Sequence, residues 1–132
     1  MGAVRGGPLR VFIADDSPAV ADMLTELIAD PGRIEVCGVA DTGEAILEAI
    51  RTLKPDVVVL DLQLKNGSGT DVIRAVRADA SLAGTRLIVA SNHAAPQLRA
   101  GCLALGAEAY YDKVKELGAL TARLGELADI AS

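Results

Sequence analysis

Five side chains that can take part in phosphate chemistry stand at the ends of short apolar segments in this 132-residue chain. Asp61 comes directly after an unbroken run of valine and leucine, and the pair Asp15–Asp16 comes directly after another apolar run. Ser91 and Lys113 follow two further segments of this kind. In open parallel sheets, ligands bind beyond the carboxyl ends of the strands. If the four segments are strands of one such sheet, the five side chains share one crevice.

The chemistry that fits this set is phosphoryl transfer. Crowded carboxylates repel one another and hold protons unless a cation relieves them. Mg²⁺ takes one or two carboxylates, a carbonyl and several waters, usually together with phosphate oxygens. The Lys113 ammonium and the Ser91 hydroxyl suit the oxygens of the same phosphoryl group. An aspartate that acts as the nucleophile in such a site forms an acyl phosphate.

Alternating strands and helices are predicted to position these side chains. The strand-like apolar runs cover residues 9–14, 34–40, 57–60, 86–90 and 108–111. Helical spacing marks residues 18–30 after a Ser17 cap, a segment from an Asp41 cap to Leu53, and residues 72–80, 95–105 and 116 onward. This order predicts an α/β fold, a (βα)5 flavodoxin-like doubly wound parallel sheet with strand order 2-1-3-4-5.

Composition narrows the class of protein. The chain is 51% hydrophobic with a formal net charge of -5, which indicates one folded domain and disfavours direct binding of nucleic acid. No apolar run approaches the roughly 20 residues of a membrane span. Residues 1–8 lack the apolar core of a signal peptide and are predicted to be a flexible leader before a domain over residues 9–130. Cys37 and Cys102 lack metal-ligand spacing, which favours free thiols in a reducing cytoplasm.

The segment before the lysine adds a further pattern, because Gly106–Ala107 and Tyr110 precede Lys113. Together with the five polar side chains, this pattern resembles the receiver domain of bacterial response regulators in two-component systems. The resemblance extends from about Leu9 to Ala128.

The resemblance implies an acceptor and a metal site. Asp61 is expected to take a phosphoryl group from the phosphohistidine of a sensor histidine kinase or phosphotransfer protein. Asp16, Asp61 and the backbone carbonyl of Gln63 are expected to bind Mg²⁺, with Asp15 acting through a metal-bound water.

The resemblance also implies a switch. Lys113 is expected to contact the aspartate or its phosphate, and Ser91 to move toward the phosphoryl group. Tyr110 is expected to change rotamer with it, so that the surface of the fourth helix, fifth strand and fifth helix changes. The output is then contact with another protein, as yet unknown.

Four positions depart from the common pattern of the family. Val114 stands where a proline usually follows the lysine, and Lys65 replaces a usual proline after the third strand. Ser68 stands where an acid is frequent. Asn92 is larger than the residue typical beside Ser91 and borders the access path to the phosphate, so we expect altered hydrolysis of the acyl phosphate.

The interpretation is a single-domain binding module that catalyses only its own phosphorylation and dephosphorylation. The alternatives are a small Mg²⁺-dependent phosphohydrolase, a receiver cut from a longer regulator, and a receiver that no longer takes phosphate. Either a monomer or a phosphorylation-dependent homodimer is compatible, because Leu117, Leu124 and Leu127 could face the core or a dimer partner. His93 is interpreted as a polar residue at a helix start.

Overall fold

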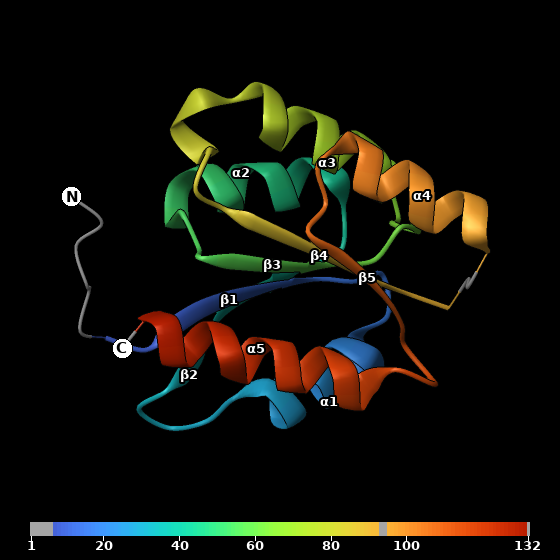
Figure 1. Ribbon diagram of the computed structural model, residues 1–132. Coiled ribbons are helices and arrows are strands. Elements are labelled where there is room, and N and C mark those ends of the chain that lie inside the picture. Colours follow the sequence, from blue (N-terminus) through green and yellow to red (C-terminus); the bar gives the residue numbers. More distant parts are fainter. Residues whose placement is uncertain (1–6, 93–94, 132) are drawn as a thin grey trace.

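The protein is described from a computed structural model, and the description is confined to residues 7–92 and 95–131 (Figure 1). Its strands are β1 (Leu9–Ala14), β2 (Ile34–Ala40), β3 (Val57–Leu60), β4 (Arg86–Ser91) and β5 (Ala109–Asp112). Its helices are α1 (Pro18–Ile28), α2 (Gly43–Leu53), α3 (Gly69–Ala78), α4 (Pro96–Leu105) and α5 (Leu117–Ala131), with a short 3-10 helix η1 (Ala80–Leu82) after α3.

The five strands form one parallel sheet in the order β2-β1-β3-β4-β5. The predicted α/β fold and its strand order are therefore confirmed. β1 pairs with β2 on one side and with β3 on the other, so the winding of the chain reverses between β1 and β3. This reversal opens the crevice at the carboxyl edge in which such folds bind ligands.

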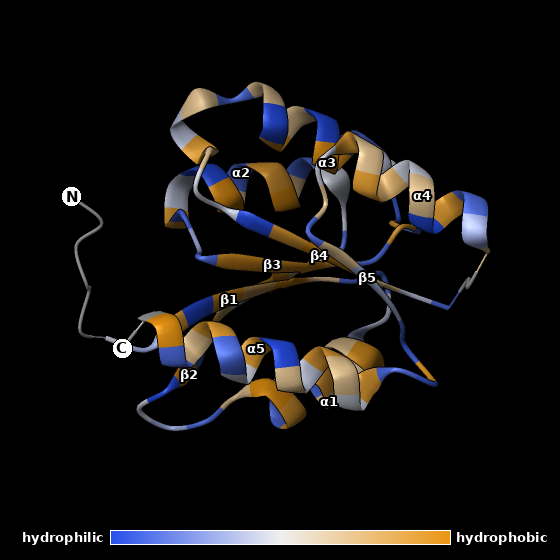
Figure 2. Ribbon diagram, in the orientation of Figure 1, coloured by the Kyte–Doolittle hydropathy of each residue, from blue (hydrophilic) through white to orange (hydrophobic). Residues whose placement is uncertain are grey.

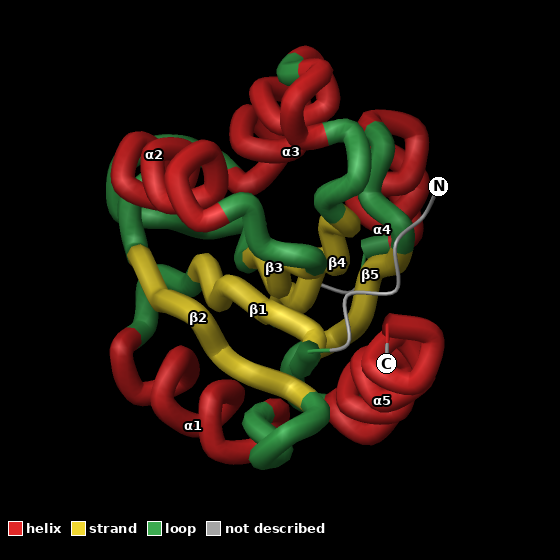
Figure 3. Tube along the Cα trace, turned by 90° about the vertical axis from the view of Figure 1, so that its left-hand side faces the viewer, coloured by secondary structure: helices red, strands yellow, loops and turns green. Residues whose placement is uncertain are grey.

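Two separate cores lie on the two faces of the sheet. Helices α2, α3 and α4 cover one face, and α1 and α5 cover the other (Figures 1 and 3). Because both faces are covered, β3 at the centre of the sheet is apolar along its whole length (Figure 2), and all four of its residues are buried. Leu120, Leu124 and Leu127 of α5 are buried in the core. The sequence does not decide whether certain leucines of this helix face the core or a dimer partner. Leu124 and Leu127 belong to the core.

The boundaries of two helices differ from the prediction. Ser17 caps α1 as expected and accepts a hydrogen bond from the Val20 amide, but the helix ends at Ile28 because Ala29 is extended. The cap of α2 is Thr42, whose hydroxyl accepts from the Ala45 amide at 3.2 Å. The predicted cap, Asp41, pairs instead with Lys65 across the neighbouring loop at 2.8 Å.

Later elements differ by one to three residues, the largest difference being the start of α3 at Gly69 instead of residue 72. α3 ends at Ala78, and Ala80 lies exposed in η1 instead of on the helix. β4 extends to Ser91, and β5 begins and ends one residue later than predicted. His93, predicted at a helix start, lies outside the described residues. Within the described ranges, no helix is long and apolar enough to cross a bilayer.

Candidate functional site

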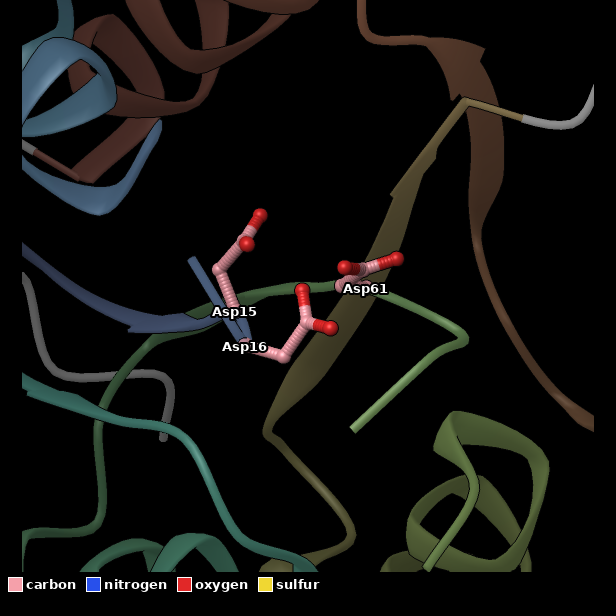
Figure 4. A group of neighbouring side chains, drawn as sticks. All are labelled: Asp15, Asp16 and Asp61. Atoms are coloured by element: carbon pink, nitrogen blue, oxygen red, sulfur yellow. The ribbon is translucent and has the colours of Figure 1, made fainter. Parts of the chain in front are cut away.

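Three carboxylates meet at the carboxyl ends of β1 and β3. Oxygen atoms of Asp15, Asp16 and Asp61 all lie within 4.8 Å of one another (Figure 4). Asp15 and Asp61 are buried, whereas Asp16 is half-buried. The Asp61 amide donates to the carbonyl of Ala14, so the pairing of β1 with β3 itself sets the two carboxylate-bearing segments side by side. The predicted convergence of the acids is confirmed.

Lys113 reaches the same crevice from the end of β5. Its Nζ lies 2.7 Å from Asp15 Oδ2 and 3.1 Å from Asp61 Oδ2. Its side chain is 4% exposed, between those of Asp15 at 2% and Asp61 at 6%. One ammonium therefore faces two buried carboxylates, with Asp16 as a third acid nearby. The cluster holds an excess of negative charge.

The pKa of Asp61 is affected by its burial in this cluster. Burial raises the pKa of the Asp61 carboxyl, and the Lys113 charge and the Gln63 amide offset this only in part. Burial also disfavours the Lys113 ammonium, but the hydrogen bonds and charges of Asp15 and Asp61 outweigh it and raise the lysine pKa. The Lys113 ammonium is thus stabilised as a cation, whereas the nearby positive charge does not fully offset the burial of the Asp61 carboxylate. Such a group gains most from an added cation or from covalent modification.

The loop after β3 holds Asp61 through a close backbone contact. The Gln63 amide donates to Asp61 Oδ1 at 3.2 Å, and the Gly69 amide donates to the Leu62 carbonyl at 2.9 Å. A Cβ at Gly69 would lie 2.4 Å from the Asp61 carbonyl oxygen, closer than any side chain can approach. The sequence marks residues 66–69 as a turn but does not reveal this contact, because the approaching carbonyl lies eight positions earlier in the chain.

Ser91 and Tyr110 lie on neighbouring strands. Ser91 is fully buried at the end of β4, and its carbonyl accepts from the Lys113 amide at 2.9 Å. The ring of Tyr110 is buried, with the Arg99 guanidinium 5.2 Å from its centroid. Arg99 also donates to the Tyr110 carbonyl at 2.6 Å, so α4 holds this part of β5. Arg99 is a residue that sequence reasoning missed, since it matches no motif.

Asn92 shares a surface hollow with Lys113. It is exposed and, with Lys113 and Val114, lines a surface hollow of about 310 Å³ completed by Val20, Met23 and Leu117. Val114 itself is 77% exposed, and no cis peptide bond occurs in the described part of the chain.

Comparison with known proteins identifies the family. The family model of the response regulator receiver domain matches residues 11–125. The chain is a receiver domain. Receiver domains of response regulators take phosphate from histidine kinases and bind Mg²⁺ at an acidic pocket. The cluster of Asp15, Asp16 and Asp61 fits such a pocket.

Relatives of this receiver domain include larger regulators. One is a protein-glutamate methylesterase/protein-glutamine glutaminase of Koribacter versatilis, 35% identical over 120 residues, which cover 89% of this chain and 32% of the relative. Another is the DNA-binding response regulator MtrA of Mycolicibacterium smegmatis, 40% identical over 73 residues, which cover 55% of this chain and 31% of that protein. The chain thus spans about a third of the length of these curated relatives.

Solved receiver domains share its three-dimensional structure. The signal receiver domain of the response regulator NarL from Mycobacterium tuberculosis superimposes with a TM-score of 0.83 at 29% sequence identity, covering 93% of this chain and 98% of that one. The response regulator domain of Thermotoga maritima CheB gives a TM-score of 0.78 at 25% identity, covering 94% and 96%. The fold is therefore that of a receiver domain over nearly the whole chain.

Proposed function

We propose that Asp61 is the phosphoacceptor of this receiver domain and that its donor is the phosphohistidine of a sensor histidine kinase or phosphotransfer protein. The observation that carries the proposal is the placement of Asp61. It is a buried carboxylate with a raised pKa, 3.1 Å from the ammonium of Lys113. Asp61 also stands directly at the end of β3, the strand buried along its whole length, whereas Asp16 is only half-buried.

The reaction is an in-line displacement at phosphorus. A carboxylate oxygen of Asp61 forms the new P–O bond, while the P–N bond of the donor breaks. The electron pair of that bond stays on the imidazole nitrogen, which takes up a proton from solvent. Lys113 already points at Asp61, so its ammonium stands ready to neutralise a phosphoryl oxygen without reorganisation of the site.

The donor set supports a magnesium site. Asp16, Asp61 and the backbone carbonyl of Gln63 would hold the ion, with Asp15 acting through a water. The available donor atoms are carboxylate and carbonyl oxygens, and the carboxylates lie within 4.8 Å of one another. This donor set and its excess of negative charge suit a hard divalent cation. When bound, Mg²⁺ supplies positive charge to the phosphoryl oxygens.

The readout proposed for this domain is a change of surface at α4, β5 and α5. The phosphoryl group on Asp61 attracts the Ser91 hydroxyl, and Tyr110 repacks as Ser91 moves. A protein bound at this surface in the cytoplasm is the proposed output, and the domain itself acts as a switch and not as an enzyme with a diffusible product. An effector in the same polypeptide is the alternative output, since the curated relatives are about three times longer than their matched regions.

Intact mass spectrometry after incubation with acetyl phosphate tests the proposal. The wild-type protein should gain one phosphoryl group in the presence of Mg²⁺ and none in EDTA. Asp61→Asn should gain none, whereas Glu48→Gln, which changes an exposed acid on α2, should behave like wild type. An adduct that persists in Asp61→Asn would assign the acceptor to another residue. Rapid turnover of a generic phosphomonoester would favour the phosphohydrolase instead.

A further inference from the structure

Lys113 depends on a loop that lies outside regular structure. β5 ends at Asp112, α5 begins at Leu117, and the ammonium of Lys113 must cross the crevice to reach the carboxylates on β1 and β3. Val114, the next residue, is largely exposed and cannot anchor the loop by packing. The path of the chain directly after Lys113 must therefore be fixed by hydrogen bonds.

The side chain of Asp112 supplies two of these hydrogen bonds. It is buried at the end of β5, and its Oδ1 accepts from the Val114 amide at 2.7 Å and from the Lys115 amide at 2.9 Å. Hydrogen bonds to an ionised acceptor are stronger than neutral ones. The same two amides, Lys115 before Val114, hold the pKa of the Asp112 carboxyl below its usual range, as expected for a carboxylate that binds in its charged form.

The backbone of Asp112 is held as well. Its amide donates to Glu116 Oε1 and its carbonyl accepts from the Glu116 amide, both at 3.0 Å. Glu116 Oε1 in turn accepts from Arg99 of α4 at 3.1 Å. Asp112 is therefore fixed at its side chain, its amide and its carbonyl, so it can serve as a rigid support for the residue that follows it.

The amide of Val114 is an essential donor in this arrangement. A proline at position 114 has no N–H and could not make the 2.7 Å bond to Asp112. Where a proline after the lysine would restrict the turn through its ring, this chain fixes the turn through the Asp112 carboxylate. That arrangement requires a residue other than proline at position 114.

From these contacts we propose that Asp112 is a positioning residue for Lys113: its carboxylate holds the Val114 and Lys115 amides and so fixes the turn that aims the lysine ammonium at Asp15 and Asp61. Asp112 touches none of the reacting groups. The consequence for phosphorylation rests on the proposed function, whereas the placement of Lys113 does not.

A graded series of substitutions tests this role. Asp112→Asn keeps an oxygen that can accept both amides, Asp112→Ser keeps a weaker acceptor, and Asp112→Ala keeps none. The phosphorylation rate is measured with acetyl phosphate and saturating Mg²⁺. We expect Asp112→Asn to react within about threefold of the wild-type rate and Asp112→Ala to react about tenfold or more slower, because a misplaced catalytic group loses its alignment. Asp112→Ser should react at a rate between those of the other two variants. Rescue by Asn separates acceptor geometry from a general loss of charge.

Asp79→Ala is the matched control. Asp79 likewise accepts two hydrogen bonds, from the amide and hydroxyl of Ser81 at 3.0 and 2.6 Å, but it does so at the start of η1. Its loss should leave the phosphorylation rate unchanged. A double-mutant cycle with Lys113→Ala gives a second check. If Asp112 acts only through Lys113, Asp112→Ala should cause no further slowing in the Lys113→Ala background.

A direct readout without phosphate follows the ammonium itself. The side-chain ¹⁵N–¹H signal of Lys113, assigned by its absence from Lys113→Arg, should be visible in wild type, Asp112→Asn and Asp79→Ala and lost in Asp112→Ala. An unchanged signal in Asp112→Ala, or in Asp112→Ser should the alanine variant not fold, overturns the proposal. A lost signal in a protein whose wild type takes no phosphate keeps the positioning role and refutes the proposed function.

Discussion

Removal of the negative charge of Asp61 should stabilise the metal-free protein. The carboxylate is buried in a cluster in which three acids share one ammonium. Asp61→Asn keeps the shape of the side chain, but its single amide oxygen can replace only one of the two carboxylate oxygens, which accept from the Gln63 amide and from Lys113. The substitution therefore removes charge repulsion and retains one of these two hydrogen bonds.

The expected size follows from the distances. At an effective dielectric constant of about 20, two charges 4.8 Å apart interact by about 3.5 kcal/mol. Asp61 has two such repulsive partners, Asp15 and Asp16, and one attractive partner, Lys113 at 3.1 Å, worth about 5.4 kcal/mol on the same scale. Repulsion exceeds attraction by about 1 to 2 kcal/mol, and the burial of the carboxylate adds to this penalty. The loss of one hydrogen bond offsets about 1 kcal/mol of this gain, so we expect Asp61→Asn to raise the free energy of unfolding by about 1 to 2 kcal/mol at pH 7.

Urea unfolding in EDTA at several pH values is the assay. Because the native pKa of Asp61 is raised, the native state binds its proton more tightly than the unfolded state, and wild type loses stability as pH rises through that pKa. The advantage of Asp61→Asn should be largest at neutral pH and should vanish once the pH falls to the ordinary range of an aspartate, where both side chains are neutral.

Magnesium should make wild type more stable than Asp61→Asn, the reverse of the order in EDTA. An ion that binds only the native state stabilises it more, the more tightly it binds. The wild-type cluster should bind Mg²⁺ more tightly because it has one more anionic ligand than Asp61→Asn. Glu48→Gln, an exposed acid on α2, should change neither measurement by more than about 0.5 kcal/mol. An Asp61→Asn protein that is less stable than wild type in EDTA at pH 7 would refute the argument from charge excess.

Three further predictions concern other parts of the domain. Gly69→Ala places a methyl group 2.4 Å from the Asp61 carbonyl and should destabilise the fold by about 2 kcal/mol or more in urea unfolding, whereas Gly84→Ala, where a Cβ meets open space, should cost less than about 1 kcal/mol. Leu124→Ala should cost about 2 to 5 kcal/mol in the same assay because Leu124 is fully buried beneath α5; a loss below about 1 kcal/mol would contradict this placement. Asn92→Ala should change the half-life of the acyl phosphate, followed by intact mass after donor removal, because Asn92 borders the hollow next to Lys113; equal half-lives would refute its role in access.

Most of the fold and the positions of the acids could be predicted from the sequence. The apolar runs that precede Asp15 and Asp61 are strong signals because strands covered on both faces have no polar alternation to blur them. The alternation of such strands with helices leaves few topologies, and the order of the sheet then brings the ends of β1 and β3 together. Lys113 could be predicted by the same logic, from the end of β5.

The supporting contacts could not be predicted, because each joins residues whose partners depend on exact loop geometry. Arg99 on α4 forms an ion pair with Glu116 in the loop before α5, and the spacing of the two residues in the sequence does not predict this pair. The Asp112 turn is local and uses an aspartate two and three positions before its amide donors, a known turn pattern. The turn pattern by itself does not show that this aspartate holds the loop after Lys113.

The two cores have a consequence for how β5 can move. Along this strand, Tyr110 packs into the core beneath α2, α3 and α4, while Tyr111 packs against the core beneath α1 and α5. A displacement of β5 therefore disturbs both halves of the molecule at once, and close-packed interiors yield in discrete rearrangements. Because β5 contacts both cores, the core covered by α5 must repack whenever a shift of β5 repacks the core covered by α4. Hydrogen exchange should accordingly report the two faces changing together, as one cooperative unit.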